Sequence, residues 1–172
     1  MTLHSVAMQQ ALDQLQRGQE TGGEGEGVQG LQLGQTVACL SGTGGFGTHT
    51  LAPAKLCMPL PSGFPAVDAA AFIMTYATSH HALIDRGQLK AGETVLILGA
   101  AGGVGTAAIQ IAKAAGARVI AAASNDDKCA LCAQLGADAT INYQTQNLRD
   151  ALKALTDGKG PDVVYDPVGG EL

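Results

Sequence analysis

"LGAAGGVG", residues 98–105, is the stretch that decides the fold of this chain. An apolar run with the character of a buried strand, residues 94–99, leads into it. Apolar residues then recur on one face of a predicted helix, at Val104, Ala108, Ile111, Ala112 and Ala115. A glycine-rich turn between a buried strand and an amphipathic helix is the setting of a dinucleotide-binding loop. The position therefore favours nucleotide binding over the alternative, a tight turn that binds nothing.

Three glycines define the usual loop, G-x-G-x-x-G, and the first of them is missing here. If Gly102 and Gly105 are the second and third, Ala100 occupies the first position. Gly99 eases the first turn, Gly102 lets a pyrophosphate approach the backbone, and Gly105 lets the helix pack closely on the strand. The helix N-terminus offers unpaired N–H groups to the phosphates. The predicted phosphate-binding residues are Ala101, Gly102, Gly103 and Val104.

Strands and helices alternate through the rest of the chain. Further buried strands are predicted at 118–123, 139–143 and 162–166, with helices at 125–136 and 148–156. Such alternation predicts a parallel, doubly wound α/β sheet of the Rossmann type. The sequence ends where the next helix is expected, so we expect a partial Rossmann sheet. Strand 162–166 should then present an exposed edge, through which copies of the chain can form a homo-oligomer.

The N-terminal part of the chain is less regular. Residues 17–30 are rich in Gly, Glu and Gln and are expected to form a linker. Short β-like runs at 35–40 and 47–53 flank a glycine-rich turn and predict a hairpin. An Ala-rich helix is expected over 68–86. Residues 1–24 match no pattern and are left as an unassigned tail.

Composition and charge narrow the class of protein. The chain has 172 residues, a net charge of −5, 46% hydrophobic residues and 24 glycines. An acidic chain offers no basic surface to nucleic acid or to an anionic membrane, and no apolar run is long enough to span a bilayer. Its four cysteines are scattered, so no disulfide framework is predicted and a cytoplasmic location is the default expectation.

Several segments resemble one family. "AGETVLILGAAGGVGTAAIQIAKAAGARVIAAAS" (91–124), "GADATINY" (136–143) and "DVVYDPVGG" (162–170) are similar to the zinc-independent quinone oxidoreductase (NADPH:quinone reductase) branch of the medium-chain dehydrogenase/reductase superfamily. Residues 25–61 resemble the end of the family's GroES-like catalytic domain. In that branch A-x-G-G-V-G is the expected spelling of the loop, so Ala100 is no defect.

The resemblance implies a domain organisation and an activity. Residues 25–66 would be a β-rich remnant of the GroES-like domain, although Gln35 replaces the family's usual Asp of "GDRV". Residues 67–172 would be an NADP-binding Rossmann domain. The implied reaction is hydride transfer from NADPH to a small electrophile, a quinone or an enone (an α,β-unsaturated carbonyl), without a metal. No catalytic side chain is assigned.

Two alternatives to this activity stay open. The acceptor of hydride could be an enoyl thioester or an alkenal, since the residues that distinguish these substrates belong to the earlier part of the catalytic domain. The chain could also be a non-catalytic nucleotide-binding fragment, because the resemblance covers about half of a family member and suggests truncation at both ends.

Residues near the end of the second Rossmann strand indicate which nicotinamide cofactor is bound. An NAD site places an acid at the strand tip to bind the ribose 2′-hydroxyl. Here Ser124 stands at that tip, and the nearest acids, Asp126 and Asp127, fall in the following helix. Lys128 can reach back to neutralise a 2′-phosphate. In the family, the lysine and tyrosine matching Lys128 and Tyr143 contact that phosphate, so the resemblance implies NADPH.

Two further features concern the nicotinamide half of the site and metals. Residues 75–83 resemble the family helix that runs under the nicotinamide, which places Thr78 and His81 near the cofactor. The G-H-E signature and four-cysteine lobe of zinc-dependent relatives do not occur in the sequence. Cys129 and Cys132 have C-x-x-C spacing within a predicted helix, where two small buried residues are the better interpretation. No metal site is predicted.

Overall fold

A computed structural model describes residues 29–32, 34–40, 42 and 49–170. The chain forms two compact units, which divide between residues 73 and 74. In the described part of the chain, the first unit contains a pair of short antiparallel strands and the second contains a four-stranded parallel sheet. No helix among these residues is long and apolar enough to cross a membrane.

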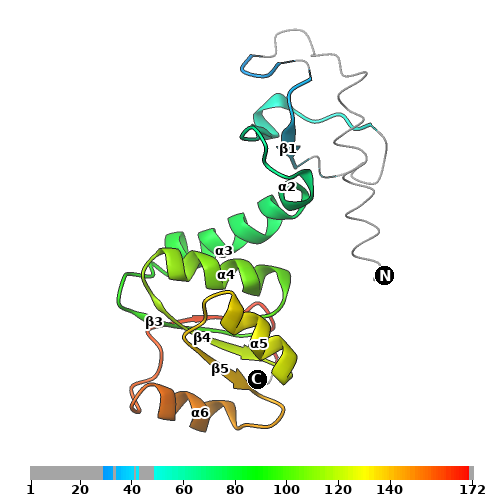
Figure 1. Cartoon of the computed structure of the whole chain (residues 1–172). Helices are drawn as coiled ribbons and strands as arrows, with labels where there is room; N and C mark the ends of the chain where they lie inside the picture. Colours follow the sequence, from blue (N-terminus) through cyan, green and yellow to red (C-terminus); the bar gives the residue numbers. More distant parts are fainter. Residues whose placement is uncertain (1–28, 33, 41, 43–48, 171–172) are drawn as a thin grey trace. The chain divides into compact units, whose positions relative to one another are not determined.

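The parallel sheet of the second unit confirms the predicted α/β class. Its strands follow the order β5-β4-β3-β6, and all neighbours are parallel (Figure 1). They are β3 (Thr94–Ile97), β4 (Arg118–Ala123), β5 (Ala139–Asn142) and β6 (Val163–Tyr165). The chain moves outward from β3 through β4 to β5 and then crosses to the other side of β3. This reversal of direction makes the sheet doubly wound.

Helices cover both faces of this sheet. They are α4 (Gly103–Ala114), α5 (Asp126–Gln134) and α6 (Leu148–Leu155). Alternate residues of β3 point to opposite faces, so Ile97 lies in a core shared with α4 and α5, and Leu96 lies in a second core against α6. Alanine-rich β4 lets these helices approach the sheet closely.

The helical segment before the sheet begins and ends close to the predicted bounds of 68–86. It comprises α2 (Ala66–Phe72), η2 (Ile73–Ala77), α3 (Thr78–His80) and η3 (His81–Arg86). The two η segments are π-helical and flank α3, where Ser79 is fully buried and donates a hydrogen bond to the carbonyl of Val104 at 2.8 Å. The sequence does not predict these π-helical turns. They lie on either side of α3, whose Ser79 contacts α4.

The described strands of the first unit correct the predicted hairpin. β1 (Val37–Cys39) pairs with β2 (Cys57–Pro59), which follows the short helix η1 (Ala54–Leu56). Residues 49–53 form no strand. Leu51, the largest apolar side chain of that stretch, is 96% exposed, so the β-like run has no buried residue to hold it in a sheet.

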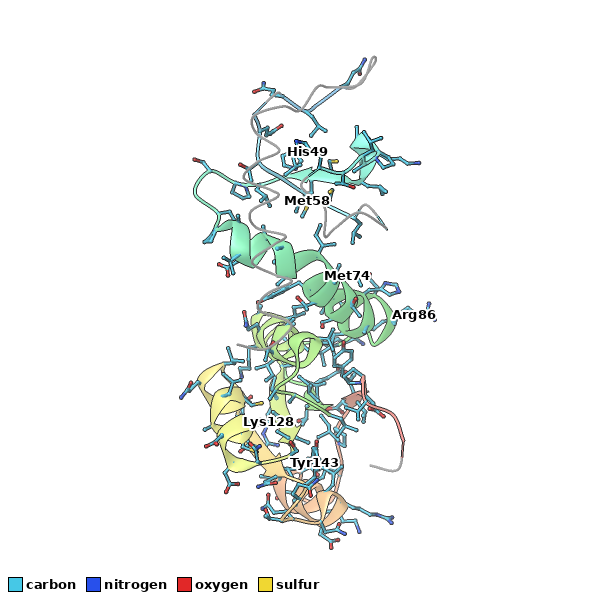
Figure 2. The ribbon with its side chains drawn as sticks, turned by 90° about the vertical axis from the view of Figure 1, so that its right-hand side faces the viewer. His49, Met58, Met74, Arg86, Lys128 and Tyr143 are labelled. Carbon is cyan, nitrogen blue, oxygen red and sulfur yellow. The ribbon has the colours of Figure 1, made fainter. Side chains whose placement is uncertain are left out.

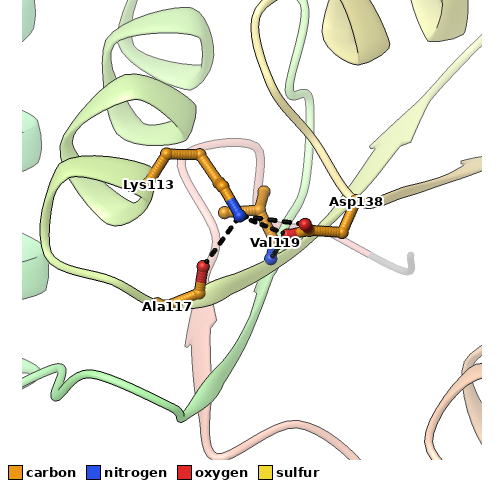
Figure 3. Close-up of polar contacts among 4 residues, drawn as sticks. All are labelled: Lys113, Ala117, Val119 and Asp138. Atoms are coloured by element: carbon orange, nitrogen blue, oxygen red, sulfur yellow. Dashed lines mark hydrogen bonds and ion pairs between the residues drawn. The ribbon is translucent and has the colours of Figure 1, made fainter.

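An ion pair joins α4 to the starting ends of β4 and β5 (Figure 3). Lys113 Nζ lies 2.9 and 2.8 Å from the two carboxylate oxygens of Asp138 and also donates to the carbonyl of Ala117 at 3.2 Å. Asp138 accepts a further hydrogen bond from the Val119 N–H at 2.7 Å. Burial alone would raise the pKa of Asp138. The hydrogen bonds from Lys113 and Val119, with the nearby positive charges, outweigh it and hold the pKa below its ordinary value.

This network predicts that the free energy of unfolding depends on pH. A carboxyl whose pKa is lower in the folded state stabilises the fold above its unfolded pKa, about 3.9, and loses that contribution as pH falls through the folded value. Asp138→Asn should therefore lower the free energy of unfolding at pH 7 by about 1 kcal/mol, given the partial exposure of the pair. Urea unfolding at pH 7 and at pH 3 measures this, and the difference between variant and wild type should shrink at pH 3.

Strand β6 is an edge of the sheet in the described part of the chain. It pairs with β3 alone, and its middle residue, Val164, is 55% exposed. An apolar edge strand tends to pair with another chain. We expect the chain to self-associate with rising concentration in sedimentation velocity, and Val164→Lys to shift it toward monomer without loss of helical circular dichroism. An unchanged distribution for this variant would place the contact elsewhere.

Candidate nucleotide-binding site

The carboxyl ends of all four parallel strands meet at one edge of the sheet. The segments that leave this edge lie side by side in the strand order: Tyr143 after β5, Ser124 after β4, the glycine loop after β3 and Asp166 after β6. The glycine loop stands where the winding direction of the sheet reverses. Open parallel sheets bind their ligands at this switch point, so the geometry places a candidate site there.

The turn after β3 explains why alanine is tolerated at the first glycine position. Gly99, with φ +57°, takes the left-handed conformation that the turn requires. Ala100 is fully buried and donates its N–H to the carbonyl of Ala122 in β4 at 3.0 Å. Its methyl group is part of the core that the sheet shares with α4. The predicted easing of the first turn by Gly99 agrees with this geometry.

Gly105 allows the close approach of helix and strand that the sequence predicted. A Cβ at this position would lie 2.6 Å from the carbonyl oxygen of Ala100 and 2.7 Å from its Cα. Both are backbone atoms that cannot move aside, so only glycine fits. The contact fixes the first turn of α4 against the end of β3.

The N-terminus of α4 has the features of a phosphate site. Gly102 is the N-cap, is exposed, and supplies no side chain to cap the helix. The N–H groups of the first helical turn, at Gly103, Val104 and Gly105, have no acceptor four residues earlier within the helix. A Cβ on Gly102 would meet only the carbonyl oxygen of Gly99, in a tight contact at 3.3 Å. These residues fit a pyrophosphate.

Ser124 and Lys128 are brought together at the end of β4. Lys128 Nζ donates to Ser124 Oγ at 3.0 Å, and Asn125 between them caps α5 by accepting the Lys128 N–H at 2.9 Å. Tyr143 joins them from the next strand, because its N–H donates to the carbonyl of Ala123 at 3.1 Å. Figure 2 labels Lys128 on α5 and Tyr143 beyond β5. The three residues predicted to meet a 2′-phosphate thus cluster at two neighbouring strand ends.

Sequence reasoning did not identify Asn142 as part of this site. Its side-chain amide donates to the carboxylate of Asp126 at 2.7 Å, and Asn142 is only 7% exposed. The nearest acid to Ser124 is therefore held by a neighbouring strand. No pattern in the sequence pairs residues 126 and 142, because the contact arises from the order of strands in the sheet.

The turn after β6 is a second element that the sequence did not reveal. Asp166 accepts hydrogen bonds from the N–H groups of Val168 and Gly169 at 2.9 and 2.8 Å. Val168 reaches the glycine loop, since a Cβ on Gly99 would lie 2.5 Å from its Cγ2. The turn after β6 therefore lies against the glycine loop.

The predicted nicotinamide contacts lie on the exposed face of the helical segment. Thr78 is exposed, and His81 Nδ1 lies 3.0 Å from an oxygen of Asp85 one turn later. Their neighbour Ser79 contacts Val104 in the first turn of α4. The role of Thr78 and His81 beside a nicotinamide remains a prediction.

The C-x-x-C pair is buried in α5. Cys129 is 8% exposed and Cys132 is fully buried. Burial, with a smaller contribution from Cys129, raises the pKa of Cys132 to about 11. Within the described ranges no three His, Cys, Asp or Glu side chains come together as metal ligands.

The sequence prediction that no metal is bound can be tested by chelation. We expect prolonged dialysis against a chelator to change neither the melting temperature nor the affinity for NADPH, since neither property should depend on a bound ion. Stoichiometric zinc in the purified protein, measured by atomic absorption, would contradict this expectation.

Comparisons with known proteins agree with this geometry. A family model described as zinc-binding dehydrogenase matches residues 103–172. The structure of Escherichia coli quinone oxidoreductase in complex with NADPH superposes with a TM-score of 0.80 and 34% identity, over 86% of this chain and 45% of that one. The chain belongs to the medium-chain dehydrogenase/reductase superfamily.

Two further relatives differ widely in length. A quinone oxidoreductase-like protein 2 homolog from Nematostella vectensis is 35% identical over 90% of this chain and 44% of its own length. A phenolphthiocerol/phthiocerol polyketide synthase from Mycobacterium tuberculosis is 40% identical over 86% of this chain but only 7% of its own length. This dehydrogenase/reductase chain thus spans less than half the length of each of these relatives.

Proposed function

We propose that this chain supplies the NADPH-binding part of a metal-independent reductase that delivers hydride to a quinone or an α,β-unsaturated carbonyl. The observation that carries the cofactor assignment is the hydrogen bond between Lys128 and Ser124 at the tip of β4, with Tyr143 beside them. A serine hydroxyl and an ammonium group favour a 2′-phosphate, whereas a carboxylate at the same tip would repel it.

The contact between Asp126 and Asn142 supports the same preference. An NAD site needs a carboxylate free to accept hydrogen bonds from the ribose hydroxyls. Asp126 is engaged by the buried amide of Asn142 at 2.7 Å. The acid nearest the ribose position is thereby held away from this role.

Each part of the edge has a distinct task in this proposal. The first-turn amides of Gly103 and Val104 bind the pyrophosphate, and Ser124, Lys128 and Tyr143 bind the 2′-phosphate. The turn of residues 166–169 closes the other side of the switch point. When bound, the nicotinamide supplies the hydride, and the protein orients it and keeps water from the acceptor.

The similarity to a polyketide synthase favours a second candidate acceptor, an enoyl thioester. A polyketide synthase builds its acyl chains as thioesters, and a conjugated thioester accepts hydride at its β-carbon as an enone does. The cofactor site is the same in both candidates, so the acceptor alone separates them.

A chimera tests the proposed reaction. Residues 29–170 would replace the matching part of Escherichia coli quinone oxidoreductase, and NADPH oxidation would be followed with p-benzoquinone or a crotonyl thioester as acceptor. We expect NADPH-dependent reduction of the quinone. It should be lost with Gly102→Val and retained with Ala154→Val, which adds similar bulk at an exposed position of α6. Preferred reduction of the thioester would select the second candidate. A folded chimera that binds NADPH and reduces neither acceptor would contradict the proposal.

A further inference from the structure

Two cysteines that are distant in the sequence face each other in the first unit. The antiparallel register of β1 and β2 places Cys39 directly opposite Cys57. Both side chains are half-buried, and both are free thiols. Met58, the residue that follows Cys57 in β2, is labelled in Figure 2. The pair lies on the strand ladder itself, where the backbone holds both Cα atoms in place.

The hydrogen-bond pattern of this ladder shows which kind of pair the cysteines form. The N–H of Leu60 donates to the carbonyl of Thr36 at 3.1 Å, so these two residues are a hydrogen-bonded pair. Hydrogen-bonded and non-hydrogen-bonded pairs alternate along an antiparallel ladder. Cys39 and Cys57 lie three steps further along, which makes them a non-hydrogen-bonded pair. Such pairs bring their Cα atoms to about 4.5 Å, within the range of roughly 4.4–6.8 Å seen across disulfides.

The two thiols lie close enough to affect each other. Burial raises the pKa of the Cys39 thiol, and the charge of Cys57 and a hydrogen bond shared with its thiol raise it further. Cys57 Sγ also lies 3.6 Å from the carbonyl of Pro53. A thiol with a raised pKa is slow to react as a thiolate. The register of the two strands places each thiol to react with the other once one of them has reacted with an external oxidant.

We propose that Cys39 and Cys57 are a reversible disulfide-forming site that responds to low-molecular-weight disulfides such as oxidised glutathione. One thiolate of the pair attacks one sulfur of oxidised glutathione and forms a mixed disulfide, releasing one glutathione thiolate. The other cysteine then loses its proton and attacks the protein sulfur of this mixed disulfide, releasing the second. Two protein thiols become one disulfide, one oxidised glutathione becomes two reduced molecules, and the two protons pass to the glutathione thiolates. Disulfides of this kind in reducing compartments are transient and sense redox state.

The test uses the reduced full chain incubated with oxidised glutathione. Remaining thiols are alkylated in denaturant, and the products are mapped by mass spectrometry after digestion. We expect loss of two of the four alkylatable thiols, a link between the peptides of Cys39 and Cys57 within one chain, and full reversal by dithiothreitol. The buried Cys129 and Cys132 should remain reduced.

Matched variants separate this site from chance oxidation. The double variant Cys129→Ala/Cys132→Ala should form the same link as the wild type. Cys39→Ser should instead hold one glutathione on Cys57, because no second thiol is present to displace it. Stable glutathione adducts on both Cys39 and Cys57 of the wild type, links to the cysteines of α5, or links between chains would each overturn the proposal. The peptide map of the wild-type protein tests the proposed disulfide even if a variant folds poorly.

Discussion

NADPH binding should be lost when Gly102 is replaced by valine, while the fold remains. We expect the fold to remain, because a Cβ at Gly102 would meet only the Gly99 carbonyl oxygen, in a tight contact at 3.3 Å, and the φ of −79° suits any residue. The valine side chain would occupy the place of the pyrophosphate in front of the helix amides. We expect the dissociation constant for NADPH, measured by nicotinamide fluorescence, to rise by roughly 100-fold or more, about 2.7 kcal/mol.

Two further variants act as controls for this result. Ala154→Val adds similar bulk at an exposed position of α6, on the other face of the sheet, and should leave the affinity unchanged. Gly105→Ala should act on the fold instead, because its Cβ would overlap the backbone of Ala100; overpacking of this kind costs roughly 1–3 kcal/mol or more. Near-native NADPH affinity in Gly102→Val, with unchanged circular dichroism, would show that the phosphate site lies elsewhere.

The second large effect concerns the choice between NADPH and NADH. We expect the wild-type chain to bind NADPH more tightly, and Lys128→Ala to remove most of that difference by weakening NADPH alone. A charge-assisted contact to phosphate contributes roughly 1.5–3 kcal/mol, or about 10- to 150-fold in affinity. The NADH affinity should stay nearly constant, because NADH lacks the 2′-phosphate that we propose Lys128 contacts.

Lys153→Ala is the matched control for loss of a positive charge. Lys153 is exposed in the last turn of α6, which returns the chain to the starting end of β6, opposite the carboxyl edge. Its removal should leave the ratio of the two affinities unchanged, and raised salt should reduce the ratio in the wild type but not in Lys128→Ala. Equal affinities of the wild-type chain for both cofactors would refute the assignment of the 2′-phosphate site.

The parallel sheet could be predicted from the sequence because each strand carries its own signal. The runs at 118–123 and 139–143 are rich in apolar residues, and glycines mark the helix ends between them. Gly116, for example, ends α4 with φ +79°, and the following N–H of Ala117 donates to the carbonyl of Ala112 at 3.0 Å. Local features of this kind can be recognised from the sequence because each depends on a few neighbouring residues.

Pairing between distant residues could not be predicted in the same way. The strand at 47–53 was expected from local β-propensity, yet β1 pairs with Cys57–Pro59. Within the candidate site, Ser124 and Lys128 lie one helical turn apart and their contact follows from spacing. The bond between Asp126 and Asn142 depends on which strand lies beside β4, and no single-sequence pattern encodes that.

The Lys113–Asp138 ion pair has a consequence for how such proteins diverge. It ties α4 to the starting ends of β4 and β5, at the edge opposite the one where the glycine loop and the turns after β4, β5 and β6 emerge. A substitution at the loop edge can therefore change the proposed cofactor contacts without touching this ion pair, and a substitution of Lys113 or Asp138 can change stability without touching the loops. Ligand binding and folding stability can therefore change in separate evolutionary steps, because the length of each strand separates the two edges of the sheet.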